Sequence, residues 1–114
     1  RRTAEARRQE QRQTQSLTYL KARFAERLTV PGLAAVINLS PEQFTRFFKA
    51  AFHRTPMVFL LAFRLQQAAL LLRQTAAPIT DIAFQVSFQS ANYFAAQFKR
   101  HYGLSPTAFR KITE

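Results

Sequence analysis

The sequence lacks cysteine and tryptophan altogether, and it has one methionine and two glycines among 114 residues. The absence of cysteine excludes disulfides, thiolate metal sites and a thiol nucleophile. Only six acidic residues and two histidines are present, with no nucleophile–base spacing and no glycine-rich phosphate loop. We therefore expect a protein that is not an enzyme and that uses no metal and no cofactor.

Long apolar segments are also absent. The longest unbroken run is PMVFLLAF at residues 56–63, whereas a membrane-spanning helix needs about 20 apolar residues. No signal peptide is visible in the sequence. We expect no membrane partner and a cytoplasmic location.

Acidic charge is scarce, since 17 basic residues stand against six acidic ones and give a net charge of +11. Residues 1–12 hold five Arg and two Glu, a net +3, which leaves 12 basic and four acidic residues, or +8, for residues 13–114. The basic charge therefore belongs to the folded region as well as to the N-terminal segment. Such a domain favours polyanions, most often nucleic acid. An anionic membrane or an acidic protein is the alternative.

One segment of the chain is repeated after 50 residues. SPEQFTRFFKAAFHRTPMVF at residues 40–59 is echoed by SANYFAAQFKRHYGLSPTAF at residues 90–109. Two copies indicate a pair of similar modules. Six of the 20 positions are identical, namely Ser40/Ser90, Phe44/Phe94, Phe48/Phe98, Lys49/Lys99, Pro56/Pro106 and Phe59/Phe109.

Helix-start signals and apolar spacing predict an all-α fold with about seven helices and no strand. Ser16 is expected to cap a helix whose apolar stripe reaches Leu28, and residues 1–15 are expected to be a solvated linker or a frayed helical N-terminal arm. The other predicted start and stop signals are Pro31, Ser40–Pro41, Thr55–Pro56, Thr80, Ser90, Gly103 and Ser105–Pro106. The predicted inward faces are Phe44, Phe47, Phe48, Ala51 and Phe52, then Met57, Leu61, Leu65, Ala68 and Leu72.

Each repeat thus contains a short helix, a tight turn and a second helix, which is the helix-turn-helix unit. The two units are predicted at residues 31–52 and 80–102, joined by a long helix at about 56–74, within a DNA-binding domain of residues 16–114. Opposite the Phe face of the first unit lie Glu42, Thr45, Arg46 and Lys49. Arg pairs with guanine, Glu accepts from cytosine, and Thr bonds a base or touches a thymine methyl. Glu42 and Arg46 could instead form an i,i+4 ion pair.

The corresponding positions of the second unit are poorer in long side chains. They are Asn92, Ala95, Ala96 and Lys99, of which only Asn92 offers a bidentate contact to adenine. Contacts to DNA phosphates are expected from Ser40, Lys49, Ser90, Lys99 and Arg100. The second unit is therefore expected to bind mainly the DNA backbone.

The chain resembles the DNA-binding domain of the AraC/XylS family of bacterial transcription regulators over residues 17–112. The resemblance rests on LSPEQFTRFFKAAFHRTPMVFL, RLQQAALLL and ITDIAFQVSFQSANYFAAQFKRHYGLSPTAFRK. It implies double-stranded DNA as partner, with the second helix of each unit in successive major grooves. It also implies RNA polymerase as a partner, association with the nucleoid, and an effector-binding or dimerisation domain on the N-terminal side. The implied base-contact residues are Glu42, Thr45, Arg46, Ala91, Asn92 and Ala96.

The sequence departs from the family pattern at two places. Ser87 stands where the family usually has Gly before Phe88, and Ala95–Ala96 stand where long polar side chains are common. A Ser with positive φ costs about 1 kcal/mol relative to Gly. The remaining rival to DNA binding is a helical protein-interaction module whose charge serves solubility.

Overall fold

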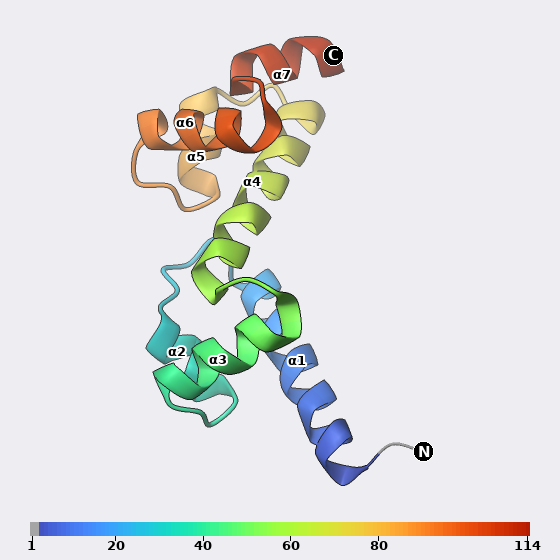
Figure 1. Ribbon diagram of the computed structural model, residues 1–114. Helices are drawn as coiled ribbons and strands as arrows, with labels where there is room; N and C mark the ends of the chain where they lie inside the picture. The colour runs from blue at the N-terminus through green and yellow to red at the C-terminus, as the bar shows by residue number, and fades with distance from the viewer. Residues whose placement is uncertain (1–2) are drawn as a thin grey trace. The chain divides into compact units, whose positions relative to one another are not determined.

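The computed structural model describes residues 3–114, which form seven α-helices and no strand (Figure 1). The all-α prediction is confirmed. Residues 1 and 2, at the start of the predicted arm, lie outside the described part of the chain. The helices are α1 (Ala4–Ala22), α2 (Val30–Val36), α3 (Pro41–Phe52), α4 (Pro56–Gln74), α5 (Ile79–Gln85), α6 (Ala91–Tyr102) and α7 (Pro106–Thr113).

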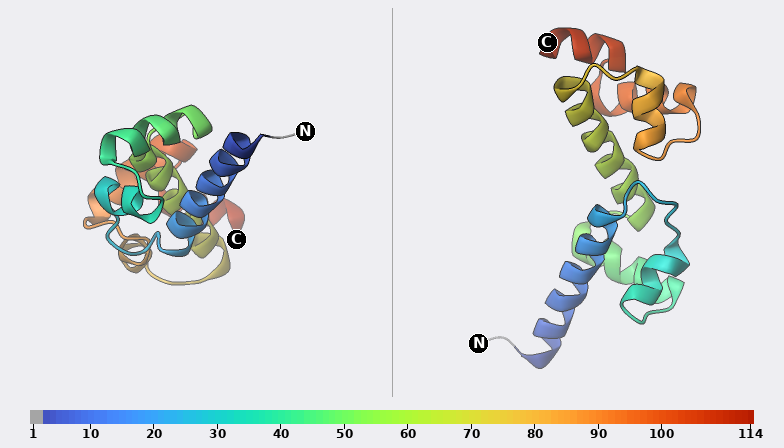
Figure 2. Two further views of the ribbon diagram at one scale, coloured as in Figure 1. Left: turned by 90° about the horizontal axis from the view of Figure 1, so that it is seen from below. Right: turned by 180° about the vertical axis from the view of Figure 1, so that it is seen from behind.

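The chain divides into two compact units, Arg1–Leu60 and Leu61–Glu114, and the division falls within α4. In the first unit α2 packs beside α3, and in the second α5 packs beside α6, as the views of Figure 2 also show. These two pairs are the predicted helix-turn-helix units, and their bounds differ from the predicted ones by no more than a residue at either end.

Serine side chains cap α3, α6 and α7, as predicted. The Ser40 hydroxyl accepts from the Gln43 N–H at 3.2 Å, and the Gln43 side chain accepts from the Ser40 N–H at 3.0 Å, which forms a capping box. The Ser90 hydroxyl caps α6 through Tyr93, and Ser105 caps α7 through Ala108. Each cap stabilises its helix by about 1 kcal/mol.

Equivalent phenylalanines form the cores of the two units. In the first unit Phe48 meets Phe59 edge to face, with ring centroids 5.5 Å apart. In the second unit the matching pair, Phe98 and Phe109, has the same geometry at 5.3 Å. The sequence repeat is therefore a packing repeat, since the identical positions form the same aromatic pair in each unit.

The start and end of α1 differ from the prediction. The helix begins at Ala4 after Thr3, and Ser16 is a buried residue in mid-helix whose hydroxyl donates to the Arg12 carbonyl at 2.7 Å. Residues 4–15 are rich in Ala, Arg, Glu and Gln, which favour helix without any apolar stripe. The helix also ends at Ala22, so Leu28 lies in the connection to α2.

Two smaller predictions are wrong. Thr80 does not cap α5, because Pro78 holds the N-cap position and no side chain caps that helix. Met57 is 41% exposed instead of buried. It precedes Leu65 by eight residues, and 3.6 residues per turn rotate it about 80° away from the buried line of α4.

Helix α4 is the one helix of residues 3–114 that is long and apolar enough to cross a membrane by length and composition. The same composition suits the core helix of a folded domain. Leu60, Leu65 and Leu72 are almost fully buried by protein, and the helix also carries Arg64 and Arg73. These buried leucines of α4 are therefore used for packing against the rest of the chain.

Candidate nucleic-acid interface

The outer face of α3 carries the predicted base-contact residues of the first unit. Phe44 and Phe48 face the core, and this leaves Glu42, Arg46 and Lys49 exposed and Thr45 half-buried. Among residues 3–114, Glu42 forms no salt bridge with Arg46. Both side chains are thus available to an external partner, and the ion-pair alternative has no support in the structure.

The outer face of α6 has a different chemistry. Asn92 and Ala96 are exposed, whereas Ala91 and Ala95 are half-buried. Lys99 and Arg100 are exposed in the last turn, where cations also interact favourably with the helix dipole. The middle of this face therefore offers only methyl groups, with one amide before them and two cations after them.

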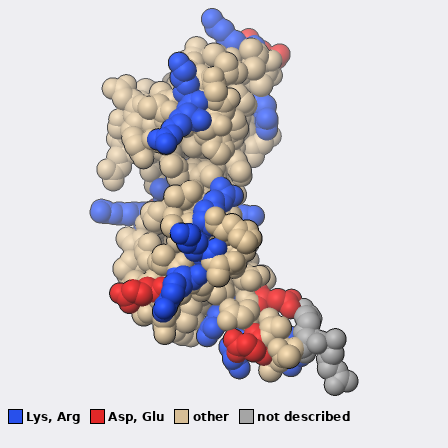
Figure 3. Space-filling model, viewed as in Figure 1, with Lys and Arg blue, Asp and Glu red and all other residues tan. Residues whose placement is uncertain are grey.

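Basic side chains lie over both candidate recognition helices. Figure 3 shows Lys and Arg side chains over α3 in the first unit and, in the second unit, over α6. The two serines predicted to contact phosphate are the N-caps of these helices. The capping box already uses the Ser40 N–H, so the hydroxyl proton is the donor that Ser40 retains for a phosphate oxygen.

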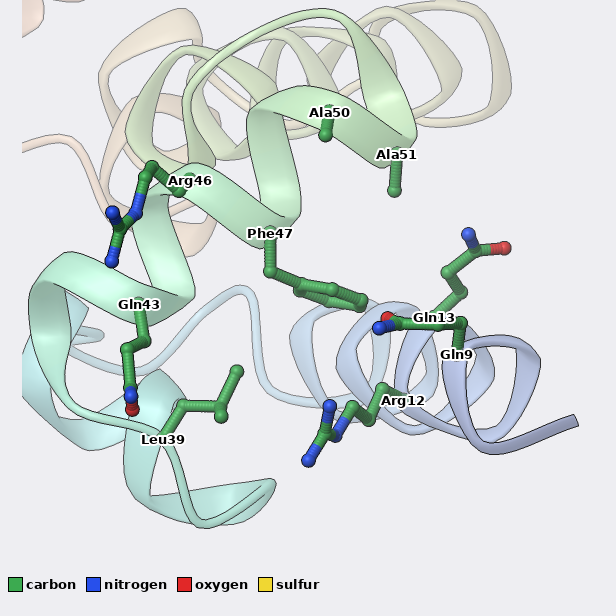
Figure 4. A pocket seen from close by; sticks show the side chains of 9 residues that line it. All are labelled: Gln9, Arg12, Gln13, Leu39, Gln43, Arg46, Phe47, Ala50 and Ala51. Atoms are coloured by element: carbon green, nitrogen blue, oxygen red, sulfur yellow. The ribbon is translucent and has the colours of Figure 1, made fainter. Parts of the chain in front are cut away.

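A groove between α1 and α3 was missed by the sequence analysis. It has a volume of about 460 Å³, and Figure 4 shows its lining side chains coming from α1, from α3 and, for Leu39, from the turn before α3. The i,i+3 and i,i+4 spacing of Gln9, Arg12 and Gln13 was the available signal, but it has meaning only if residues 4–15 are helical. The lining residues are Gln9, Arg12, Gln13, Leu39, Gln43, Arg46, Phe47, Ala50 and Ala51.

Groups suited to metal binding do not converge anywhere in residues 3–114. No three residues of the types His, Cys, Asp and Glu lie close enough together there to hold a metal ion. His53 ends α3 in a left-handed conformation, and the His101 ring packs on Tyr102 with centroids 4.7 Å apart. Both histidines thus lie at helix ends, His53 as the C-cap of α3 and His101 in the last turn of α6.

Comparisons with known proteins agree with this geometry. The family model described as a helix-turn-helix domain matches residues 33–112. The transcriptional regulator MtrA of Neisseria gonorrhoeae is 39% identical over 82 residues, which cover 72% of this chain and 27% of that protein. The chain spans about a third of the length of the curated relatives it matches.

Two solved structures have the same fold. An AraC-type transcriptional regulator from Chromobacterium violaceum gives a TM-score of 0.86 at 26% identity, covering 91% of this chain and 93% of that one. The DNA-binding domain of AdpA, solved with a target DNA, gives 0.83 at 26% identity, covering 87% and 89%. The chain therefore belongs to the helix-turn-helix family of AraC/XylS-type transcription regulators, which are DNA-binding proteins and not enzymes.

Proposed function

We propose that this domain binds duplex DNA sequence-specifically, with α3 and α6 in successive major grooves. The observation that carries the proposal is the exposed face of α3, where Glu42 and Arg46 extend from a helix fixed by its Phe face and its capping box. The likeness to a domain solved with its target DNA supports it. The net charge of +11 favours a polyanionic partner.

The proposed base contacts divide unequally between the units. In the first unit Glu42, Thr45 and Arg46 supply an acceptor, a hydroxyl and a bidentate donor. In the second unit Asn92 can bond adenine, while Ala91 and Ala96 can only touch methyl groups. Phosphate contacts are assigned to Ser40, Lys49, Ser90, Lys99 and Arg100.

The wider role of the protein is inferred from its family. Residues 16–114 would be the DNA-binding domain, and residues 1–15 an arm leading to an N-terminal effector-binding or dimerisation domain. The matched part of this chain covers 35% and 36% of two of these relatives, which leaves room in them for such a domain. A transcription regulator of this type would work in the cytoplasm, on the nucleoid, together with RNA polymerase.

Selection of bound sequences from random duplexes, followed by footprinting, tests the proposal. Two recognition helices one DNA turn apart need centres about 34 Å apart, so one chain should protect one face of about 20 base pairs. Protection of a single half-site would contradict the use of both units. Equal affinity for all duplexes would instead favour a protein-interaction module with non-specific charge.

Arg46→Ala tests the central contact of the proposal. Loss of a bidentate guanine contact should cost about 1–3 kcal/mol on the best site and relax preference at one base pair. Ala96→Gly, which removes only a methyl group from the second unit, is the matched control and should leave base preference nearly unchanged. Equal weakening on every sequence would make Arg46 a phosphate contact.

A further inference from the structure

The N-terminal half of α1 contributes no fully buried residue to the core of the first unit. The buried residues of α1 are Ser16 and Leu20, both in its second half. Residues 4–15 contain no large apolar side chain and yet remain helical. A helix segment that is polar on all sides gains little stability from packing, which favours a role in contacting a partner.

This polar half of α1 forms one wall of the α1–α3 groove. Arg12 and Gln13 line it from α1, and Gln43 and Arg46 line it from α3 (Figure 4). Two arginines and three glutamines thus line one groove, and none of its nine lining residues is acidic. Such a set of donors fits a ligand with several negatively charged acceptor oxygens.

The groove continues the face of α3 that is proposed to contact bases. Arg46 belongs to both surfaces, and Gln43 and Ala50 follow about 40–60° further around the helix. A helix in the major groove has a sugar–phosphate backbone on either side of it. The backbone on the α1 side would pass over Gln43 and Ala50, and the small side chain of Ala50 permits close approach.

We propose that the α1–α3 groove binds the sugar–phosphate backbone of one DNA strand beside the α3 site, with Arg12 as its main phosphate contact. The inference rests on the proposed DNA binding and adds an α1 contact to it. Arg12 is half-buried, and its carbonyl accepts the Ser16 hydroxyl at 2.7 Å. The backbone that carries Arg12 is therefore held at the edge of the packed core.

Paired variants of α1 test the assignment. Arg12→Ala should weaken the selected site and a random duplex equally, by about tenfold near 0.1 M salt, since it removes one charge-assisted contact. It should also lower the slope of log affinity against log salt by about 0.9. Arg7→Ala removes one positive charge from the same helix at a position about 140° around the helix axis from Arg12. It should change both the affinity and the salt slope much less than Arg12→Ala does. Alanine favours helix, so neither variant should unfold α1.

Neutral methylphosphonate linkages then locate the contact on DNA. Substitution at one or two positions beside the α3 site should weaken DNA binding by the unaltered protein. It should have no further effect on DNA binding by Arg12→Ala. The assignment is overturned if Arg12→Ala behaves like Arg7→Ala, or if it changes base preference. If the unaltered protein shows no DNA binding, the proposed function itself fails. If it binds specifically while Arg12 and Arg7 are equivalent, only the groove assignment fails.

Discussion

Left-handed backbone conformations recur at equivalent residues of the two units. Asn38 and Ser87 have φ values of 58° and 71° in the turns between helices, and His53 and Gly103 have 64° and 79° at the ends of α3 and α6. Asn and Gly tolerate this region, whereas other L-residues adopt it at a cost of about 1–2 kcal/mol. The second unit therefore carries its strain in the turn, and the first unit carries its strain at the helix end.

Ser87→Gly should relieve the strain in the second turn. We expect the free energy of unfolding to rise by up to about 1 kcal/mol, partly offset by the greater freedom of glycine in the unfolded chain. Urea unfolding of the variant measures the change. Ser87→Ala keeps the strained φ and is the control; equal stability of the two variants would contradict the argument.

Tyr102 gives the second unit a pH dependence. Burial raises the pKa of its hydroxyl above the usual 10.0, opposed by the nearby positive charge of Arg73. A raised folded-state pKa means a stabilising contribution that is complete below about pH 10 and is lost as the pH rises through the folded-state value.

Unfolding of the protein and of Tyr102→Phe should therefore be compared from pH 8 upward. The phenyl ring keeps the contacts with Phe98 and Phe109, whose centroids lie 4.7 and 5.5 Å from that of Tyr102. We expect the stability of the protein relative to the variant to fall above about pH 10. The comparison cancels the titration of lysines, which both proteins share. A difference that is constant with pH would show that the hydroxyl is not buried enough to matter.

At the scale of helices, features that depend on neighbouring residues were predictable from the sequence. Features that depend on residues far apart in the chain were not. Ser40, Ser90 and Ser105 were predicted as caps because a cap depends on a few neighbouring residues. Ser16 was predicted as the N-cap of α1 in place of Thr3, since a helix segment without an apolar stripe has no periodic signal. The α1–α3 groove was missed because Arg12 and Phe47 come to line one groove only through the packing of the first unit. The exposed positions of α3 could be predicted because the Phe stripe defines the opposite face, and the base contacts assigned to them stay a prediction.

Leu65 tests the packing of α4. It is 2% exposed and is a bulky side chain on the buried line of that helix. Leu65→Ala should create a cavity and lower the free energy of unfolding by about 2–5 kcal/mol. Any loss of DNA affinity should track the unfolded fraction, because Leu65 lies on neither recognition helix. Met57→Ala, at an exposed position of α4, should cost far less; equal costs would show that the buried line is misassigned.

At the scale of the whole molecule, the two units share a packing scheme but differ in surface chemistry. The first unit has Glu42, Thr45 and Arg46 on its recognition helix, and the second has cations after a row of methyl groups. We infer a division of labour, in which the first unit selects the sequence and the second holds the backbone. Because the difference lies in side chains and not in fold, it can be tested by substitution.

Paired substitutions in the two units should separate these roles. Lys99→Ala combined with Arg100→Ala removes two proposed phosphate contacts, so it should weaken selected and random duplexes similarly and flatten the salt slope by up to about two units. Glu42→Ala removes an acceptor and no cation. It should change the preferred base at one position and leave the slope nearly unaltered. The difference in salt slope follows from counterion release, which depends on the number of phosphates neutralised and not on base identity. Sequence selection on both variants decides the matter, and a changed base preference in the Lys99/Arg100 variant together with an unchanged one in Glu42→Ala would reverse the assigned roles.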